Sequence, residues 1–130
     1  MRYIRFVVSR RDEDSGFRQG VIQAVYELVK SGRLSRYEEE LVRETEQWLG
    51  AHLARPIRFA RKRNVSHRRT HGLSWFKDTA TEHLRRIRSL VGLLEEHGVP
   101  VEMVMSERPG YIVYEDEFQV VAEPFGESGA

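Results

Sequence analysis

The sequence predicts an α+β domain of two layers, in which three main helices pack on one face of a mainly antiparallel sheet of about four strands. Three observations predict this class. An alternating apolar pattern begins the chain, three segments of helical periodicity follow, and three strand patterns in close order come after them. The expected order is strand, helix, helix, basic segment, helix and then three strands. Because the strands are grouped instead of alternating with helices, a parallel α/β sheet is disfavoured.

The first strand is expected over residues 2–8. Ile4, Phe6 and Val8 occupy alternate positions there, in a stretch rich in aromatic and β-branched residues. A sheet of this kind has edges, and the arginines of this strand, Arg5 among them, would partly protect it against the addition of another strand.

Two helices joined by a short turn are expected next. Apolar residues within 17–28 recur at helical spacing, and Gly32 provides a C-terminal stop. Ser35 and Glu38 form a Ser-x-x-Glu capping box at the start of the second helix, for which Gly50 is the expected end. The short connection around Gly32 predicts a helical hairpin.

The third helix has the clearest pattern in the chain. Its apolar residues within 80–94 are spaced alternately by four and three positions, which gives a continuous stripe. Thr79 and Ser74 are alternative N-caps, and the second would place Trp75 in the first turn. Gly98 is expected to end the helix.

Three strands are expected at residues 101–105, 111–114 and 118–122, where they would form an antiparallel meander. A Pro-Gly pair within residues 108–111 has the signature of a type II turn. The acidic turn at 115–117 is so short that the two strands it joins must be antiparallel neighbours.

The 130 residues suffice for one hydrophobic core, and we expect a single domain at residues 1–123 with a flexible tail at 124–130. The absence of Cys excludes disulfides, thiolate catalysis and Cys-based zinc sites. No apolar run approaches the roughly 20 residues of a membrane span, and the first apolar run is too short for a signal peptide. No P-loop, dinucleotide-binding or nucleophile-elbow motif is present. We therefore expect a cytoplasmic protein with no membrane contact, no metal site and no cofactor.

The strongest functional signal is a window from Gln47 to Lys77 that contains no Asp or Glu. Within it, residues 55–71, here called the basic segment, include seven Arg or Lys residues, although the net charge of the whole chain is only +1. The rest of the chain has 14 basic against 20 acidic residues, a net charge of −6. This segregation predicts a polyanionic partner, in the first place RNA or DNA. The expected contact residues are Arg55, Arg58, Arg61, Lys62, Arg63, Arg68, Arg69, Trp75 and Lys77.

The role of Trp75 depends on its exposure. An exposed indole beside a basic segment would stack on unpaired bases, as is usual in the recognition of single strands. The alternative is that Trp75 is a core residue, which is the more frequent fate of tryptophan in a domain of this size.

Two other functions stay open. His67 and His71 could act as acid and base, with Arg69 stabilising charge, in a metal-independent nuclease or phosphodiesterase. The pair is a poor metal site, because no third ligand is near and cations surround it. Alternatively, the protein is an interaction or assembly module whose basic segment meets an acidic surface such as residues 38–46. Such a module could be a homo-oligomer.

Overall fold

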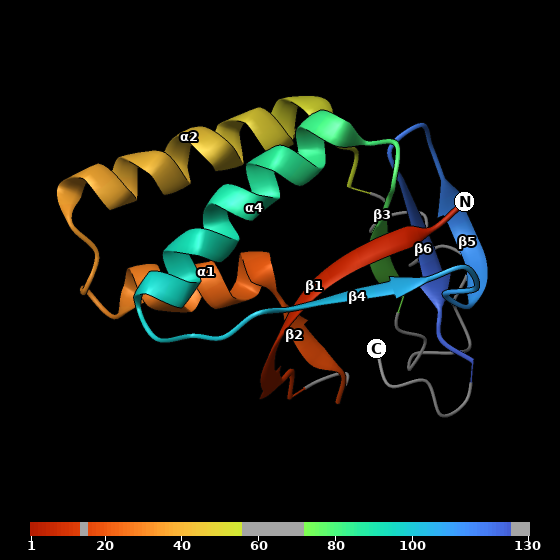
Figure 1. Ribbon diagram of the computed structural model, residues 1–130, viewed down its shortest axis with the longest axis horizontal. Coiled ribbons are helices and arrows are strands. Elements are labelled where there is room, and N and C mark those ends of the chain that lie inside the picture. Colours follow the sequence, from red (N-terminus) through yellow and green to blue (C-terminus); the bar gives the residue numbers. More distant parts are fainter. Residues whose placement is uncertain (14–15, 56–71, 126–130) are drawn as a thin grey trace.

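The computed structural model describes residues 1–13, 16–55 and 72–125, which form three helices and one six-stranded sheet (Figure 1). The predicted α+β class is confirmed, with six strands in place of about four. Apart from Arg55, the basic segment lies outside the described residues. In chain order the elements are β1 (Tyr3–Arg11), β2 (Arg18–Gly20), α1 (Val21–Lys30), α2 (Arg36–His52), β3 (Leu73–Lys77), α4 (Thr81–Glu96), β4 (Glu102–Ser106), β5 (Tyr111–Glu115) and β6 (Gln119–Glu123).

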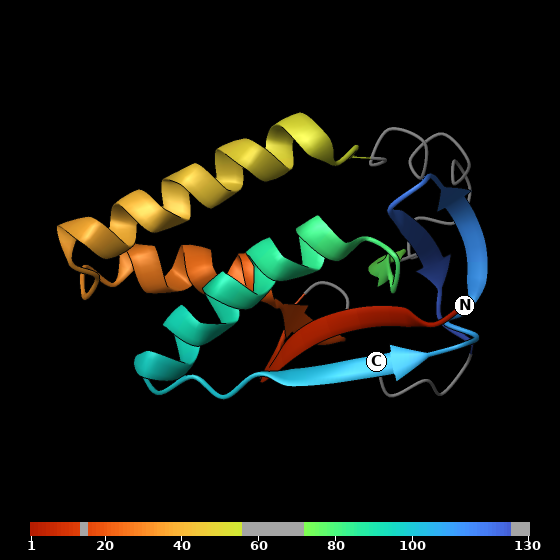
Figure 2. The same ribbon diagram turned by 45° about the horizontal axis from the view of Figure 1, so that its top comes forward.

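The main core lies between the helices and the sheet. Ile4, Phe6 and Val8 of β1 face it at alternate positions, as the sequence predicts. α4 covers them with its buried stripe, and it runs between β1 and α2 (Figure 2). α1 has four buried residues in only ten, whereas the longer α2 has just three, Thr45 among them. α2 is therefore the outer helix of the layer, with most of its surface in solvent.

A smaller core lies on the opposite face of the sheet. Leu73, Trp75, Val120 and Ala122 form it, with Tyr3 packed against them. Trp75 is only 2% exposed, so the condition for stacking on a base, an exposed ring, is not met.

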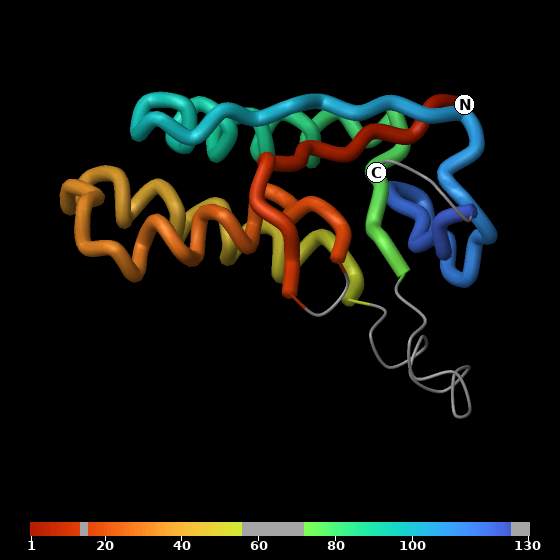
Figure 3. The backbone as a smooth tube through the Cα atoms, turned by 90° about the horizontal axis from the view of Figure 1, so that it is seen from below, coloured from red at the N-terminus to blue at the C-terminus, as the bar shows by residue number. Residues whose placement is uncertain are grey.

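β1 is the central strand of the sheet, and all its pairings are antiparallel. Along one edge it pairs with β4 from Tyr3 to Val7. Its other edge is shared: β3 pairs at Tyr3 and Ile4, whereas β2 pairs at Val7 and Arg11. β2 and β3 therefore part from each other beside the middle of β1, and they continue as separate arms (Figure 3).

The prediction of a three-stranded meander is wrong for one of its two strand pairings. β5 and β6 pair as predicted, but β4 pairs with β1 and not with β5. The chain turns away between β4 and β5, where Pro109 is buried and Gly110 has a φ of +144°. β1 is consequently an interior strand, so the interpretation of Arg5 as protection for an edge is also wrong.

Two strands were not expected. β2 contains only Arg-Gln-Gly, which has no strand pattern, and it pairs because the chain folds back along β1. Its presence moves the start of α1 from the expected Phe17 to Val21. β3 occupies residues that the sequence assigns to the approach to the third helix, and it pairs with both β1 and β6.

The helix ends follow local chemistry in most cases. The capping box is confirmed, because Ser35 Oγ accepts from the Glu38 backbone N–H at 3.1 Å and Glu38 Oε1 accepts from the Ser35 N–H at 2.9 Å. Gly32 and Gly98 follow the ends of α1 and α4 with positive φ, as expected. Gly50 does not end α2, which runs on to His52.

The start of α4 differs from both expected caps. Its N-cap is Ala80, which has no side-chain oxygen, and neither Thr79 nor Ser74 takes that place. Burial of Ala80 in the core sets this boundary in place of a polar cap.

We expect Gly110→Ala to destabilise the fold by about 2 kcal/mol or more, because a Cβ there would overlap the Glu123 carbonyl and the φ of +144° disfavours any side chain. The matched control is Gly92→Ala in α4, where a Cβ meets nothing within 4 Å. This control should raise the free energy of unfolding by about 0.5–1 kcal/mol through helix propensity. Urea denaturation followed by circular dichroism measures both, and shifts of the same sign would contradict the expectation.

Candidate functional site

Most of the predicted contact residues cannot be placed. Arg58, Arg61, Lys62, Arg63, Arg68 and Arg69 lie outside the described residues, as do His67 and His71. Three of the predicted contacts are described. Arg55 is exposed, Trp75 is buried, and Lys77 Nζ forms an ion pair with Glu115 Oε2 at 2.7 Å. The Lys77 side chain is only 13% exposed, so its main contact is this ion pair within the sheet.

A pocket of about 440 Å³ lies where β2 and β3 part. Its walls come from the start of α1, the C-terminal half of α2, the middle of β1 and the strand β3, and Ile87 of α4 and Gln119 of β6 also line it. Arg55, the first residue of the basic segment, lines this pocket, and so does Ser74 on the far side of that segment. The volume falls in the range of ligand sites, roughly 300–1,000 Å³.

Arg5 spans the gap between the two strands. Its Nη2 donates to the Arg18 carbonyl of β2 at 3.0 Å, and its Nη1 donates to the Ser74 carbonyl of β3 at 3.4 Å. Its Nε is buried and has no acceptor among the described residues. No carboxylate in the described part of the chain pairs with Arg5, whereas its neighbour Arg18 is paired with Glu102.

Burial makes the charge of Arg5 costly. Desolvation, with the positive charge of Arg18 as a second cause, lowers the pKa of Arg5 well below its ordinary value, to about 10. A half-buried cation that is held only by two carbonyls lacks the opposite charge that would compensate for its desolvation. Arg5 therefore places a positive charge on the pocket wall that pairs with no carboxylate of the described residues.

The first turn of α1 also faces the pocket. Val21, Ile22 and Gln23 line it, and the N-cap Gly20 provides no side-chain cap. No acidic residue stands in this first turn. Backbone N–H groups at a helix start have no partner within the helix, and together with the helix dipole they favour a nearby anion. This adds to the effect of Arg5 without being a site on its own.

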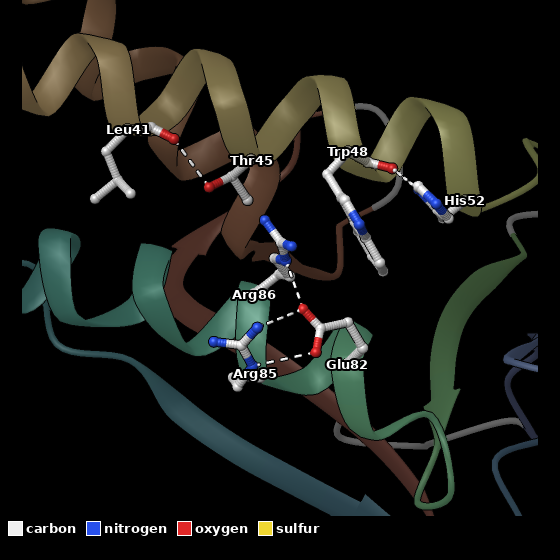
Figure 4. Close-up of polar contacts among 7 residues, drawn as sticks. All are labelled: Leu41, Thr45, Trp48, His52, Glu82, Arg85 and Arg86. Atoms are coloured by element: carbon white, nitrogen blue, oxygen red, sulfur yellow. Dashed lines mark hydrogen bonds and ion pairs between the residues drawn. The ribbon is translucent and has the colours of Figure 1, made fainter.

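Two further polar atoms at the pocket lack partners. Glu46 Oε2 and Trp75 Nε1 are buried without a hydrogen bond among the described residues, and both residues line the pocket. The adjacent Thr45 shows the ordinary situation, since its buried hydroxyl donates to the Leu41 carbonyl at 2.9 Å (Figure 4). Buried polar atoms without partners are uncommon in folded proteins, and several at one pocket make it the candidate site of this structure.

Two buried polar side chains fix the C-terminal end of α2 beside this pocket. Gln119 Nε2 donates to the Ala54 carbonyl at 2.8 Å and to Asp116 Oδ2 at 3.3 Å. His83 Nε2 donates to the His52 carbonyl at 2.8 Å. The point at which the basic segment begins is thus anchored to both β6 and α4.

Aromatic packing supports the same end of α2. The Trp48 ring stacks on His52, with ring centroids 4.2 Å apart, and the Arg86 guanidinium lies 4.7 Å from the Trp48 centroid. Figure 4 shows Trp48 between these two groups, with Arg86 held by Glu82 at 2.7 Å. Cation–π contact and stacking of this kind stabilise the packing of α2 on α4.

The pocket could not be recognised from the sequence, although two features of the sequence are related to it. Arg5 alternates with Ile4 and Phe6, so the strand pattern already assigns it to the face away from the main core. Gly20 precedes a helix without supplying a cap. Neither signal shows that β2 and β3 part at this point, because that depends on long-range pairing.

The described residues hold no group of three or more His, Asp or Glu that could bind a metal ion. None of the helices in the described part of the chain has the length and apolar character that crossing a bilayer requires. No protein family, no curated protein and no solved structure matches this chain. Function is therefore inferred from the chemistry of the pocket and of the basic segment.

We expect Arg5→Met to leave the free energy of unfolding of the ligand-free protein within about 1 kcal/mol of wild type, or to raise it. The charge of Arg5 opposes folding at every pH below its lowered pKa of about 10, and its removal offsets the loss of two hydrogen bonds. Gln119→Met is the contrast, because Gln119 is 2% exposed and its Nε2 donates two hydrogen bonds, and this change should cost about 1–3 kcal/mol. Equal destabilisation by both changes in urea denaturation would show that Arg5 is structural.

Proposed function

We propose that this protein binds single-stranded nucleic acid, RNA or DNA, with one nucleotide in the pocket and the neighbouring phosphates on the basic segment. The observation that carries the proposal is the uncompensated charge of Arg5 at the pocket wall. A phosphate oxygen beside Arg5 would supply the missing negative charge, and charge-assisted hydrogen bonds to a guanidinium are among the strongest that proteins form. The uncapped start of α1 would favour the same anion.

The position of the pocket favours a nucleic-acid strand as the ligand over a small free anion. Arg55 at its rim is the first of seven Arg or Lys residues in segment 55–71, and Ser74 beyond that segment lines the pocket again. Arg55 and Ser74 thus both line the pocket, and in the sequence six further cations lie between them. Each cation that neutralises a phosphate adds to the affinity and to its dependence on salt.

The walls of the pocket suit a nucleobase. Leu49, Leu53, Phe76 and Ile87 supply apolar surface, and Tyr26, which is 43% exposed, stands at the pocket with its ring accessible. A base has apolar faces for such walls and a polar edge for a few hydrogen bonds. Tyr26 would then take the stacking role that the sequence assigns to Trp75, with Phe76 as a second aromatic ring of the wall.

The test is fluorescence anisotropy with labelled single-stranded RNA and DNA of mixed sequence at several salt concentrations. We expect a linear fall of log affinity with log salt, since counterions are released on binding. Charge reversal at Arg61, Arg63, Arg68 and Arg69 together should lower the affinity at least about a hundredfold. Arg5→Met should lower it about tenfold, because one phosphate loses its buried partner.

A matched control reverses four exposed arginines away from the pocket, Arg2, Arg33, Arg36 and Arg108, and so changes the net charge equally. If both quadruple variants weaken binding equally, net charge alone acts and the site is misplaced. Strand cleavage in the presence of EDTA that disappears in His67→Ala or His71→Ala would favour the nuclease alternative. A salt-sensitive oligomer without nucleic acid in size-exclusion chromatography would favour the assembly alternative.

A further inference from the structure

We infer that the pocket selects guanine among the four bases, and that the Glu46 carboxylate reads its Watson–Crick edge. The inference rests on the proposed binding of a nucleic-acid strand and adds the base that the pocket takes. Glu46 lines the pocket from α2, and its Oε2 is buried with no donor among the described residues. A buried acceptor without a donor destabilises the folded protein, so a ligand that supplies N–H groups there is favoured.

The other carboxylates of α2 show that Glu46 is unusual. Glu38 accepts from the Ser35 backbone and lies 3.1 Å from His97 Nε2, and Glu40 is paired with Arg43. Glu39 and Glu44 are exposed to solvent. Among the described residues that line the pocket, Glu46 is also the single carboxylate.

The chemistry of the pocket separates donors from this acceptor. Arg5, the Trp75 indole N–H and the start of α1 all offer donors. An ionised carboxylate only accepts, and it can take two parallel N–H groups at once. Guanine alone presents two adjacent donors, N1–H and the N2 amino group. Adenine and cytosine place a ring-nitrogen acceptor beside their amino group, and uracil and thymine flank one N–H with two carbonyl oxygens, so each would set an acceptor against Glu46.

There is space for the base beside Glu46. Gly50 lies one turn further along α2 and lines the same pocket, and residues at i and i+4 share a helix face. A Cβ added to Gly50 would meet nothing within 4 Å. The absence of a side chain at this position leaves the approach to the Glu46 carboxylate open.

The test compares short uridine strands that differ in one central nucleotide, by competition anisotropy at fixed salt. We expect guanosine to bind about tenfold more tightly than adenosine, cytidine or uridine, since one bidentate base contact discriminates by this order. Inosine keeps N1–H and lacks the N2 amino group, so it should lose most of that advantage. Glu46→Gln should remove the preference for guanosine and keep the salt-dependent binding, because an amide sets a donor against N1–H.

Two further variants sharpen the outcome. Glu44→Gln makes the same change on the exposed side of α2 and should leave the preference as it is. Gly50→Leu should fold with unchanged or higher stability, because Gly is a poor helix former and the position is open, and yet it should abolish the preference by filling the pocket.

The possible failures are distinguishable. If no strand binds, the proposed function is wrong. If all five strands bind within about twofold of one another with a steep salt dependence, or if Glu46→Gln keeps the preference for guanosine, the protein binds strands and the inference about Glu46 is wrong.

Discussion

The shared edge of β1 is the constraint from which the rest of the structure follows. One strand cannot lie beside two others at the same positions, so β3 takes Tyr3 and Ile4 and β2 takes Val7 and Arg11. The gap between them interrupts the sheet, and the two carbonyls that face it need a donor. Arg5 supplies both hydrogen bonds from one guanidinium. The pocket exists because the sheet opens there and the helices above do not fill the space.

This solution places a charge where a sheet would normally carry a neutral pairing. Two carbonyls accept hydrogen bonds from the guanidinium of Arg5, but they do not neutralise its charge, and desolvation of that charge lowers its pKa. Sites of this kind trade stability of the empty protein for affinity, because the ligand completes what folding leaves unpaired. Glu46 is the corresponding case for an anion. Arg5 lacks a counter-ion, whereas the buried Oε2 of Glu46 lacks a hydrogen-bond donor.

Local patterns predicted the elements well, and long-range pairing decided what they could not. The stripe within residues 80–94 and the box at Ser35 and Glu38 are local, and the structure has both. β2 was not predictable, because a three-residue strand without apolar alternation forms only where a neighbour is already in place. The pairing of β4 with β1 and the gap beside Arg5 depend on contacts between distant segments. The candidate pocket could therefore not be predicted. The basic segment is evident from the composition, and its role in binding stays a prediction.

The central position of β1 also has a consequence for the order of folding. Its partners β3 and β4 begin at Leu73 and Glu102, so β1 is synthesised well before either of them and waits for both before its two edges are covered. Pairings so distant in sequence slow folding, because a long loop must close before any contact compensates for the lost entropy. Until then an apolar strand with two open edges is exposed to other chains. Of the elements that the structure describes before β3, β2 is the one that pairs with β1, and it covers part of one edge.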